Sequence, residues 1–188
     1  KYRLSYSLTE HVDDLDLIKN DIARECLRFL NVDPPLFIST TSDLPVSSGL
    51  GSSSSFAVGL LLALHSLRGE TVTSGQLAEE ACHIEIDVLG KPIGKQDQYA
   101  ATFGGFNFME FYAEEKVIVN PLRIKASIID ELQNNLVLYY TGTSRLSAAI
   151  IEAQQQNVVA KSVSSIDAMH NLKAQAIRMK EALLQGSL

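Results

Sequence analysis

The chain has 188 residues, enough for a sizeable hydrophobic core, and its 46% hydrophobic and 20% charged residues are typical of a globular protein rather than a disordered one. Its formal net charge of −6 is spread along the chain without a basic cluster, which argues against nucleic-acid binding. The longest apolar run, residues 56–64, covers about nine residues, whereas a membrane-spanning helix needs roughly 20. We therefore expect neither a nucleic-acid partner nor a membrane span.

The N-terminus and the two cysteines bear on the compartment. Residues 1–10 alternate polar and apolar side chains, unlike a signal peptide, and the missing initiator Met fits a fragment or a processed chain. Cys26 and Cys82 each lie among apolar neighbours in a helical pattern, which indicates buried thiols in a reducing compartment rather than a disulfide. We expect a cytoplasmic protein.

The first 43 residues predict a strand, a helix and a second strand. Apolar residues alternate over 2–8, as in a half-buried strand, and recur every three or four positions over 15–30, as in an amphipathic helix. Residues 31–35 should end that helix. The run 36–43 is rich in β-forming residues and predicts a short strand.

Two helices are expected after a loop rich in glycine and serine. Residues 52–67 are apolar on nearly every side, which predicts a buried helix. Thr73 and Gln76 make a capping-box pattern ahead of the next helix, whose apolar stripe runs from Leu77 to Val88. Gly90 and Pro92 should end it.

The rest of the chain mixes strands and helices. Residues 103–112 and 116–124 are expected to be antiparallel strands joined by a turn, and 134–142 a further strand. One helix should begin near Ser147, and another should run from Ser164 to about Gly186. Because this order is not a regular βαβ alternation, the predicted class is α+β, with a boundary near residues 124–131.

The stretch Pro45–Ser55 reads PVSSGLGSSSS, and six of its last nine residues are serine. A predicted strand precedes it and a buried helix follows at once, so its serines occupy a first helical turn whose N–H groups lack intrahelical partners. Such a turn binds anions, and Gly49 and Gly51 would let a phosphate approach the backbone. The alternative is a structural turn with serine caps.

Neither the Walker loop, the dinucleotide fingerprint nor the serine-hydrolase elbow occurs in the chain. The pattern P-x-x-x-G-L-G-S-S instead resembles the ATP-binding motif of the GHMP small-molecule kinases, except that Ser54 stands where alanine is usual. The resemblance implies an ATP site made by Pro45, Ser47, Ser48, Gly49, Leu50, Gly51, Ser52, Ser53 and Ser54.

Two carboxylates follow the loop. On a helical wheel Glu85 lies at the edge of the buried stripe, where it could face a site or turn its tip to solvent. Asp97 lies in a polar segment before Gly104 and Gly105, which by itself could be an ordinary turn. Their order and spacing resemble those of the family's metal-binding glutamate and its aspartate near the acceptor hydroxyl.

The resemblance assigns roles to these residues. Ser52 and Glu85 would bind Mg²⁺, and Asp97 would accept or orient the proton of the acceptor hydroxyl. Lys95, Gln98 and Arg145 are candidate substrate contacts, although a helix-start arginine such as Arg145 is more often a surface charge. The segments GKQDQYAATFGGFN and YYTGTSR resemble those of the family branch that phosphorylates sugars at the anomeric carbon. This resemblance implies heptose 7-phosphate as acceptor and the 1,7-bisphosphate as product.

The resemblance also implies a fold and leaves alternatives open. Residues 1–128 would be the partial ATP-binding domain, related to domain 2 of ribosomal protein S5, and 129–188 the start of a helical, ferredoxin-like domain. Because only the middle of the family's sequence is matched, we expect an internal piece that shows little or no turnover alone. A fucose- or galactose-type kinase, a non-catalytic nucleotide- or sugar-binding relative and a purely structural domain remain alternatives.

Overall fold

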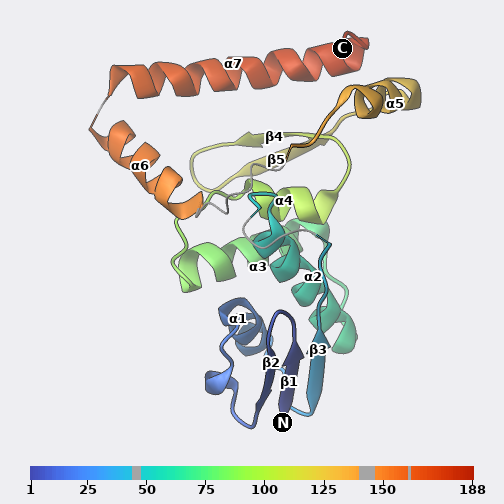
Figure 1. Cartoon of the computed structure of the whole chain (residues 1–188), viewed down its shortest axis with the longest axis vertical. Helices are drawn as coiled ribbons and strands as arrows, with labels where there is room; N and C mark the ends of the chain where they lie inside the picture. The colour runs from blue at the N-terminus through green and yellow to red at the C-terminus, as the bar shows by residue number, and fades with distance from the viewer. Residues whose placement is uncertain (44–47, 140–146, 161) are drawn as a thin grey trace. The chain divides into compact units, whose positions relative to one another are not determined.

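The structure is a computed structural model that describes residues 1–43, 48–139, 147–160 and 162–188 (Figure 1). Contacts divide the chain into two compact units, Lys1–Phe103 and Gly104–Leu188. This division falls before the expected boundary at residues 128/129. Units defined by contacts need not coincide with the domains of a protein family, so the boundary at 128/129 stays a prediction.

The first unit opens with a three-stranded sheet in the order β2-β1-β3, formed by β1 (Tyr2–Ser5), β2 (Thr9–Val12) and β3 (Leu36–Ser39). Strand β1 pairs antiparallel with β2 and parallel with β3, with Leu4 opposite both Glu10 and Ile38. The expected strand over 2–8 was therefore wrong beyond Ser5. There the chain turns back, as the 2.8 Å hydrogen bond from the Tyr6 N–H to the Leu8 carbonyl shows, and makes a hairpin.

The helix expected over 15–30 is split. A 3₁₀ turn, η1 (Leu15–Leu17), is capped by Asp14, and α1 (Asp21–Phe29) begins only after Asn20. The Asn20 side chain accepts a 2.9 Å hydrogen bond from the Ala23 N–H, so a cap interrupts what apolar spacing suggested was continuous.

Where the first unit is described beyond residue 47, it has four helical segments: α2 (Ser52–Leu67), α3 (Ser74–Cys82), the π-helix η2 (His83–Val88) and α4 (Gln96–Phe103). Helix α2 has the bounds expected from the sequence, and the predicted cap of α3 is present, with Thr73 Oγ1 accepting from the Gln76 N–H. The sequence left open an ordinary turn around Asp97 and predicted a strand from residue 103. Residues 96–103 instead form helix α4, which packs against α2 and α3.

One hydrophobic core joins the sheet to these helices. Leu4 on β1, Leu27 on α1, Leu61 on α2 and Ile84 on η2 are all fully buried or nearly so. Both cysteines are buried free thiols, as predicted. The helical ends that carry the site residues are thus held by a shared core.

The described residues of the second unit form a hairpin and three helices: β4 (Asn107–Phe111), β5 (Val117–Pro121), α5 (Ala126–Asn135), α6 (Ser147–Val159) and α7 (Val163–Gln185). The hairpin is antiparallel, as predicted, and Gly186 ends α7 in the left-handed region at φ 71°. The strand expected over 134–142 was wrong for 134–139, because 134 and 135 belong to α5 and 136–139 carry no strand, and 140–142 lie outside the described residues. Helix α5 was not anticipated.

The observed mixture of helices and strands confirms the α+β class. Among the described residues, no helix combines the length and the apolar character that crossing a bilayer requires.

Candidate active site

The loop that begins α2 has the backbone of an anion site. Gly49 and Gly51 have φ values of 77° and 70°, which a side chain would strain. Gly51 is the N-cap of α2 and has no side chain that could accept a hydrogen bond. The N–H groups of Ser52, Ser53 and Ser54 therefore stay available to an anion at the start of the helix. Pro45 and Ser47 lie outside the described residues.

Asp97 lies against this loop. A Cβ built on Gly51 would be 3.3 Å from the Asp97 Cγ and 3.5 Å from its Oδ2. The Asp97 side chain is exposed, on the first turn of α4. The glycine thus has a second reason besides its φ angle: only a residue without a side chain lets the carboxylate approach the start of α2 this closely.

Glu85 is buried completely, at 0% exposure, beside the equally buried Ile84. Both belong to η2, where the i→i+5 pattern widens the helix and departs from the 100° per residue assumed on the helical wheel. The carboxylate is therefore deeper than the edge position that the wheel predicted. Burial, followed by the charge of Glu85, raises the pKa of the Cys26 thiol to about 12.

Both oxygens of Glu85 have hydrogen-bond partners. Ser53 Oγ donates to Oε1, and Lys91 Nζ lies 3.3 Å from the same oxygen and 3.2 Å from Ser53 Oγ. Gln98 Nε2 donates to Oε2 at 2.7 Å. A fully buried carboxylate would be costly without such partners, and the cluster supplies one hydroxyl, one amide and one ammonium.

Gln98 links this cluster to the carboxylate at the loop. It follows Asp97 directly on α4, is itself fully buried, and its backbone carbonyl accepts a 2.8 Å hydrogen bond from Thr102 Oγ1. The contact of Nε2 with a carboxylate fixes the orientation of the amide, which leaves Oε1 buried without a partner among the described residues. Helix α4 thus positions Asp97 and Glu85 together.

The donor set fits a magnesium ion. Carboxylate and hydroxyl oxygens are the ligands that Mg²⁺ takes from proteins, and it keeps several waters besides. The Lys91 ammonium on Glu85 Oε1 shows that this position accepts a positive charge, and the unpartnered Gln98 Oε1 could accept from a metal-bound water. No group of three or more His, Cys, Asp or Glu side chains suits a metal among the described residues, so nucleotide and water oxygens would complete the shell.

The predicted site residues are partly brought together. Gly51, Glu85, Asp97 and Gln98 meet around the start of α2, while Ser53 rather than Ser52 contacts Glu85. Ser54 is buried on α2, and Leu50 is exposed. Ser48 Oγ is buried without a partner among the described residues. Lys95 is half-buried just before α4, and Arg145 lies outside the described residues.

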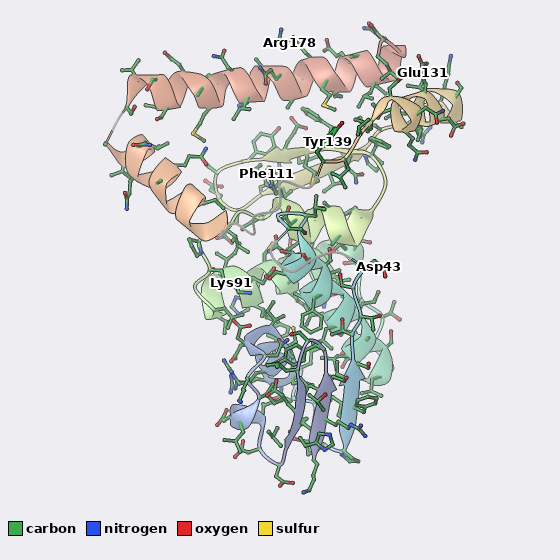
Figure 2. All side chains as sticks on the ribbon, in the orientation of Figure 1. Asp43, Lys91, Phe111, Glu131, Tyr139 and Arg178 are labelled. Carbon is green, nitrogen blue, oxygen red and sulfur yellow. The ribbon has the colours of Figure 1, made fainter. Side chains whose placement is uncertain are left out.

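Lys91 was missed by the sequence reasoning. Its position follows from Gly90, whose φ of 64° turns the chain back so that the Lys91 N–H donates to the Glu85 carbonyl at 3.0 Å. The sequence predicted only that Gly90 ends the helix. After a glycine turn of this kind, however, the N–H groups of the next residues bond to carbonyls of the last helical turn. Figure 2 shows Lys91 beside the end of the helical segment α3–η2.

Comparison with known proteins decides the family. Residues 16–105 match the family model described as the GHMP kinases N terminal domain. These residues form a GHMP kinase N-terminal domain. The predicted family resemblance and fold are confirmed, and the GHMP domain includes the loop, Glu85, Lys91 and Asp97.

Relatives of the GHMP domain include sugar kinases. The chain is 43% identical over 172 residues to D-glycero-alpha-D-manno-heptose 7-phosphate kinase of Campylobacter jejuni, covering 92% of this chain and 50% of that protein. It is 28% identical over 123 residues to galactokinase of Pyrococcus furiosus, covering 65% of this chain and 33% of that protein.

A solved structure matches over almost the whole chain. The crystal structure of a D-glycero-D-manno-heptose 1-phosphate kinase from Bacteroides thetaiotaomicron superposes with a TM-score of 0.80 at 32% identity, covering 99% of this chain and 58% of that one. The chain thus spans about half the length of the heptose-kinase relatives it matches. The chain is a homologue of heptose phosphate kinases, and its residues 16–105 are the part that belongs to the GHMP kinases.

Proposed function

We propose that the chain forms the ATP-binding part of a sugar kinase that phosphorylates the anomeric hydroxyl of D-glycero-D-manno-heptose 7-phosphate. The observation that carries the proposal is the approach of Asp97 to Gly51, which puts a carboxylate at the helix start where the phosphates of ATP would bind. The likeness to heptose phosphate kinases supports the substrate class. A cytoplasmic location is part of the same proposal.

The residues of the first unit have distinct roles in this proposal. Backbone N–H groups of Gly49 to Ser54 hold the phosphates, as an N-terminal helical turn does for anions. Asp97 orients the acceptor hydroxyl toward the γ-phosphate and accepts its proton. Ser53 and Glu85 would hold Mg²⁺, with Ser53 taking the place first expected for Ser52, and the ion would neutralise charge on the β- and γ-phosphates.

The proposal is tested by a screen for ATP-dependent phosphorylation with a longer protein that contains these 188 residues, because little or no turnover is expected of the 188 residues alone. Heptose 7-phosphate, heptose 1-phosphate, L-fucose and galactose are offered in parallel, and the product is identified by ³¹P NMR. Phosphate appearing on the anomeric oxygen of heptose 7-phosphate is the expected result. Transfer to fucose or galactose instead would assign the chain to another sugar branch.

Asp97→Asn tests the role of the carboxylate. Loss of the general base should lower transfer by at least about 10²-fold while ATP binding is retained, because the amide keeps the shape of the side chain but cannot take a proton. Unchanged transfer would refute this role. Binding of MgATP without transfer to any sugar, by the unaltered protein, would favour a non-catalytic nucleotide-binding relative.

A further inference from the structure

The Lys91 side chain is engaged at the candidate metal position. Its ammonium lies 3.3 Å from Glu85 Oε1 and 3.2 Å from Ser53 Oγ, the two atoms that would bind the metal. The Lys91 side chain is about one-quarter exposed, whereas that of Glu85 is completely buried. A buried carboxylate therefore has a partly solvated cation as its counter-charge.

The two oxygens of Glu85 are not equivalent. Oε2 accepts a 2.7 Å hydrogen bond from the Gln98 amide, whose side chain is fully buried. Oε1 receives the two groups that are nearer to solvent, Ser53 and Lys91. Oε1 is thus the oxygen that an incoming cation can reach, and the ammonium already takes up its negative charge.

We propose that Lys91 is a resident counter-charge that orients Glu85, and that it competes with the divalent cation for Oε1. The inference rests on the proposed function, since it assumes a metal at Ser53 and Glu85. Ser53 Oγ and the Lys91 ammonium already take the two lone pairs of Oε1, so a metal ion at Oε1 must displace one of these donors, and the ammonium is the one that also repels a cation. Lys91 is then a positioning residue that weakens metal binding when no nucleotide is present.

The backbone supports this role for Lys91. Its N–H is bonded to the Glu85 carbonyl, so its Cα is held close to the carboxylate whatever the side chain does. The flexible four-carbon stem can swing the ammonium away without any movement of the backbone. Displacement of the ammonium therefore needs only a change of rotamer.

The test measures Mn²⁺ binding to the nucleotide-free full chain by the electron paramagnetic resonance signal of free Mn²⁺. At about pH 8 carboxylates with ordinary pKa values are ionised. Lys91→Met should lower the dissociation constant about tenfold, the effect expected when a competing cation is removed from a part-buried pair. Lys91→Arg, which keeps a cation, should stay within about twofold of the unaltered chain.

Matched controls separate this effect from net charge and from misfolding. Lys173→Met changes the net charge equally on the exposed face of α7 and should leave the dissociation constant unchanged. If circular dichroism shows that Lys91→Met is unfolded, Lys91→Gln replaces it, because its amide can still donate to Glu85 without a charge. Equal or weaker Mn²⁺ binding by the uncharged variant overturns the inference.

The proposed function is judged separately. Adding Glu85→Gln to Lys91→Met should abolish the gain in affinity, and a gain that persists would mean that Mn²⁺ binds elsewhere and would overturn the inference. Binding of MgATP to the unaltered chain is measured by calorimetry in parallel. If MgATP binds while Lys91→Met fails to tighten Mn²⁺, only the inference falls; if MgATP does not bind, the proposed function falls too.

Discussion

Gly51 shows how one residue can serve the loop in two ways. Its φ of 70° lies in the left-handed region, and the absent side chain leaves room for the Asp97 carboxyl. Gly49 shares the first property, at φ 77°, but nothing lies within 4 Å of a Cβ built there. The two glycines therefore allow backbone strain and contact with Asp97 to be measured separately.

Gly51→Ala should destabilise the fold by about 1–2 kcal/mol and also displace Asp97, because the new methyl group lies in tight contact with that side chain. Gly49→Ala should have a similar effect on stability without moving Asp97. Denaturant unfolding measures the first effect, and the rate of phosphoryl transfer the second. Equal losses of transfer in both variants would show that contact with Asp97 is unimportant.

His65 is a buried imidazole between two carboxylates. Its Nδ1 lies 2.9 Å from Glu70 Oε2 and its Nε2 2.7 Å from Glu80 Oε2. Burial lowers the His65 pKa, but hydrogen bonds and charge from Glu80 and Glu70 outweigh burial and raise it. Both nitrogens can donate only in the imidazolium form, so the protonated ring joins the end of α2 to α3.

Stability should consequently depend on pH through His65. A raised pKa in the folded state stabilises the protein fully below the ordinary histidine pKa of about 6.5, and this contribution is lost as pH rises through the folded-state value. We expect the free energy of unfolding to fall as the pH rises above about 6.5 and through the higher folded-state pKa of His65. Arg68, which donates to Glu70, and Gln76, which donates to Glu80, face the same cluster and hold both carboxylates in place.

The control for this prediction is an exposed histidine. His83 lies on the surface of η2 and contacts Asp87 at 2.9 Å. His65→Gln should flatten the fall in stability with pH, whereas His83→Gln should leave it in place. A slope that survives His65→Gln must come from other groups.

Helices and strands with a strong local sequence pattern were predicted correctly where tertiary packing did not alter them. The bounds of α2 follow from Gly51 and an apolar sequence, and the hairpin β4-β5 follows from alternation around a turn. The hairpin β1-β2 was missed because β2 has only four residues, mostly polar. Helix α4 was missed because its first turn is polar and its apolar contacts come from α2 and α3.

For the candidate site, the sequence predicted residues that the structure brings close together, but not their contacts. Motif order identified Gly51, Glu85 and Asp97, whereas the choice of Ser53 over Ser52 depends on how the first turn of α2 faces η2. The complete burial of Glu85 depends on the π-helix, which has no recognisable signal in the sequence. Side-chain direction at a helix start and local widening of a helix are both consequences of packing.

The cap of α3 offers a test at this scale, since α3 continues directly into η2 and Glu85. Thr73→Ala removes the acceptor for the Gln76 N–H and should lower the free energy of unfolding by about 1 kcal/mol. Thr71→Ala, in the exposed segment before the helix, should change it by less than about 0.5 kcal/mol. Urea unfolding of both variants measures the difference, and equal effects would rule out a capping role.

For the whole chain, ligand binding and stability should be linked. If MgATP binds only the folded state, a concentration about 100 times its dissociation constant should stabilise the protein by about 2.7 kcal/mol. Asp97→Asn should keep this stabilisation, because Asp97 is assigned to the acceptor hydroxyl. Thermal unfolding with MgATP, with Mg²⁺ alone and without either measures it, and stabilisation by Mg²⁺ alone to the same extent would contradict a nucleotide site.

The two buried cysteines have a practical consequence for labelling. Burial is the main cause that raises the pKa values of both Cys26 and Cys82 to about 12, so almost none of either thiol is thiolate at neutral pH. Maleimides and similar reagents attack the thiolate, and the native protein should therefore react very slowly with them. A single cysteine introduced at exposed Leu50 could then carry a fluorophore on the loop before α2 without replacement of either native thiol.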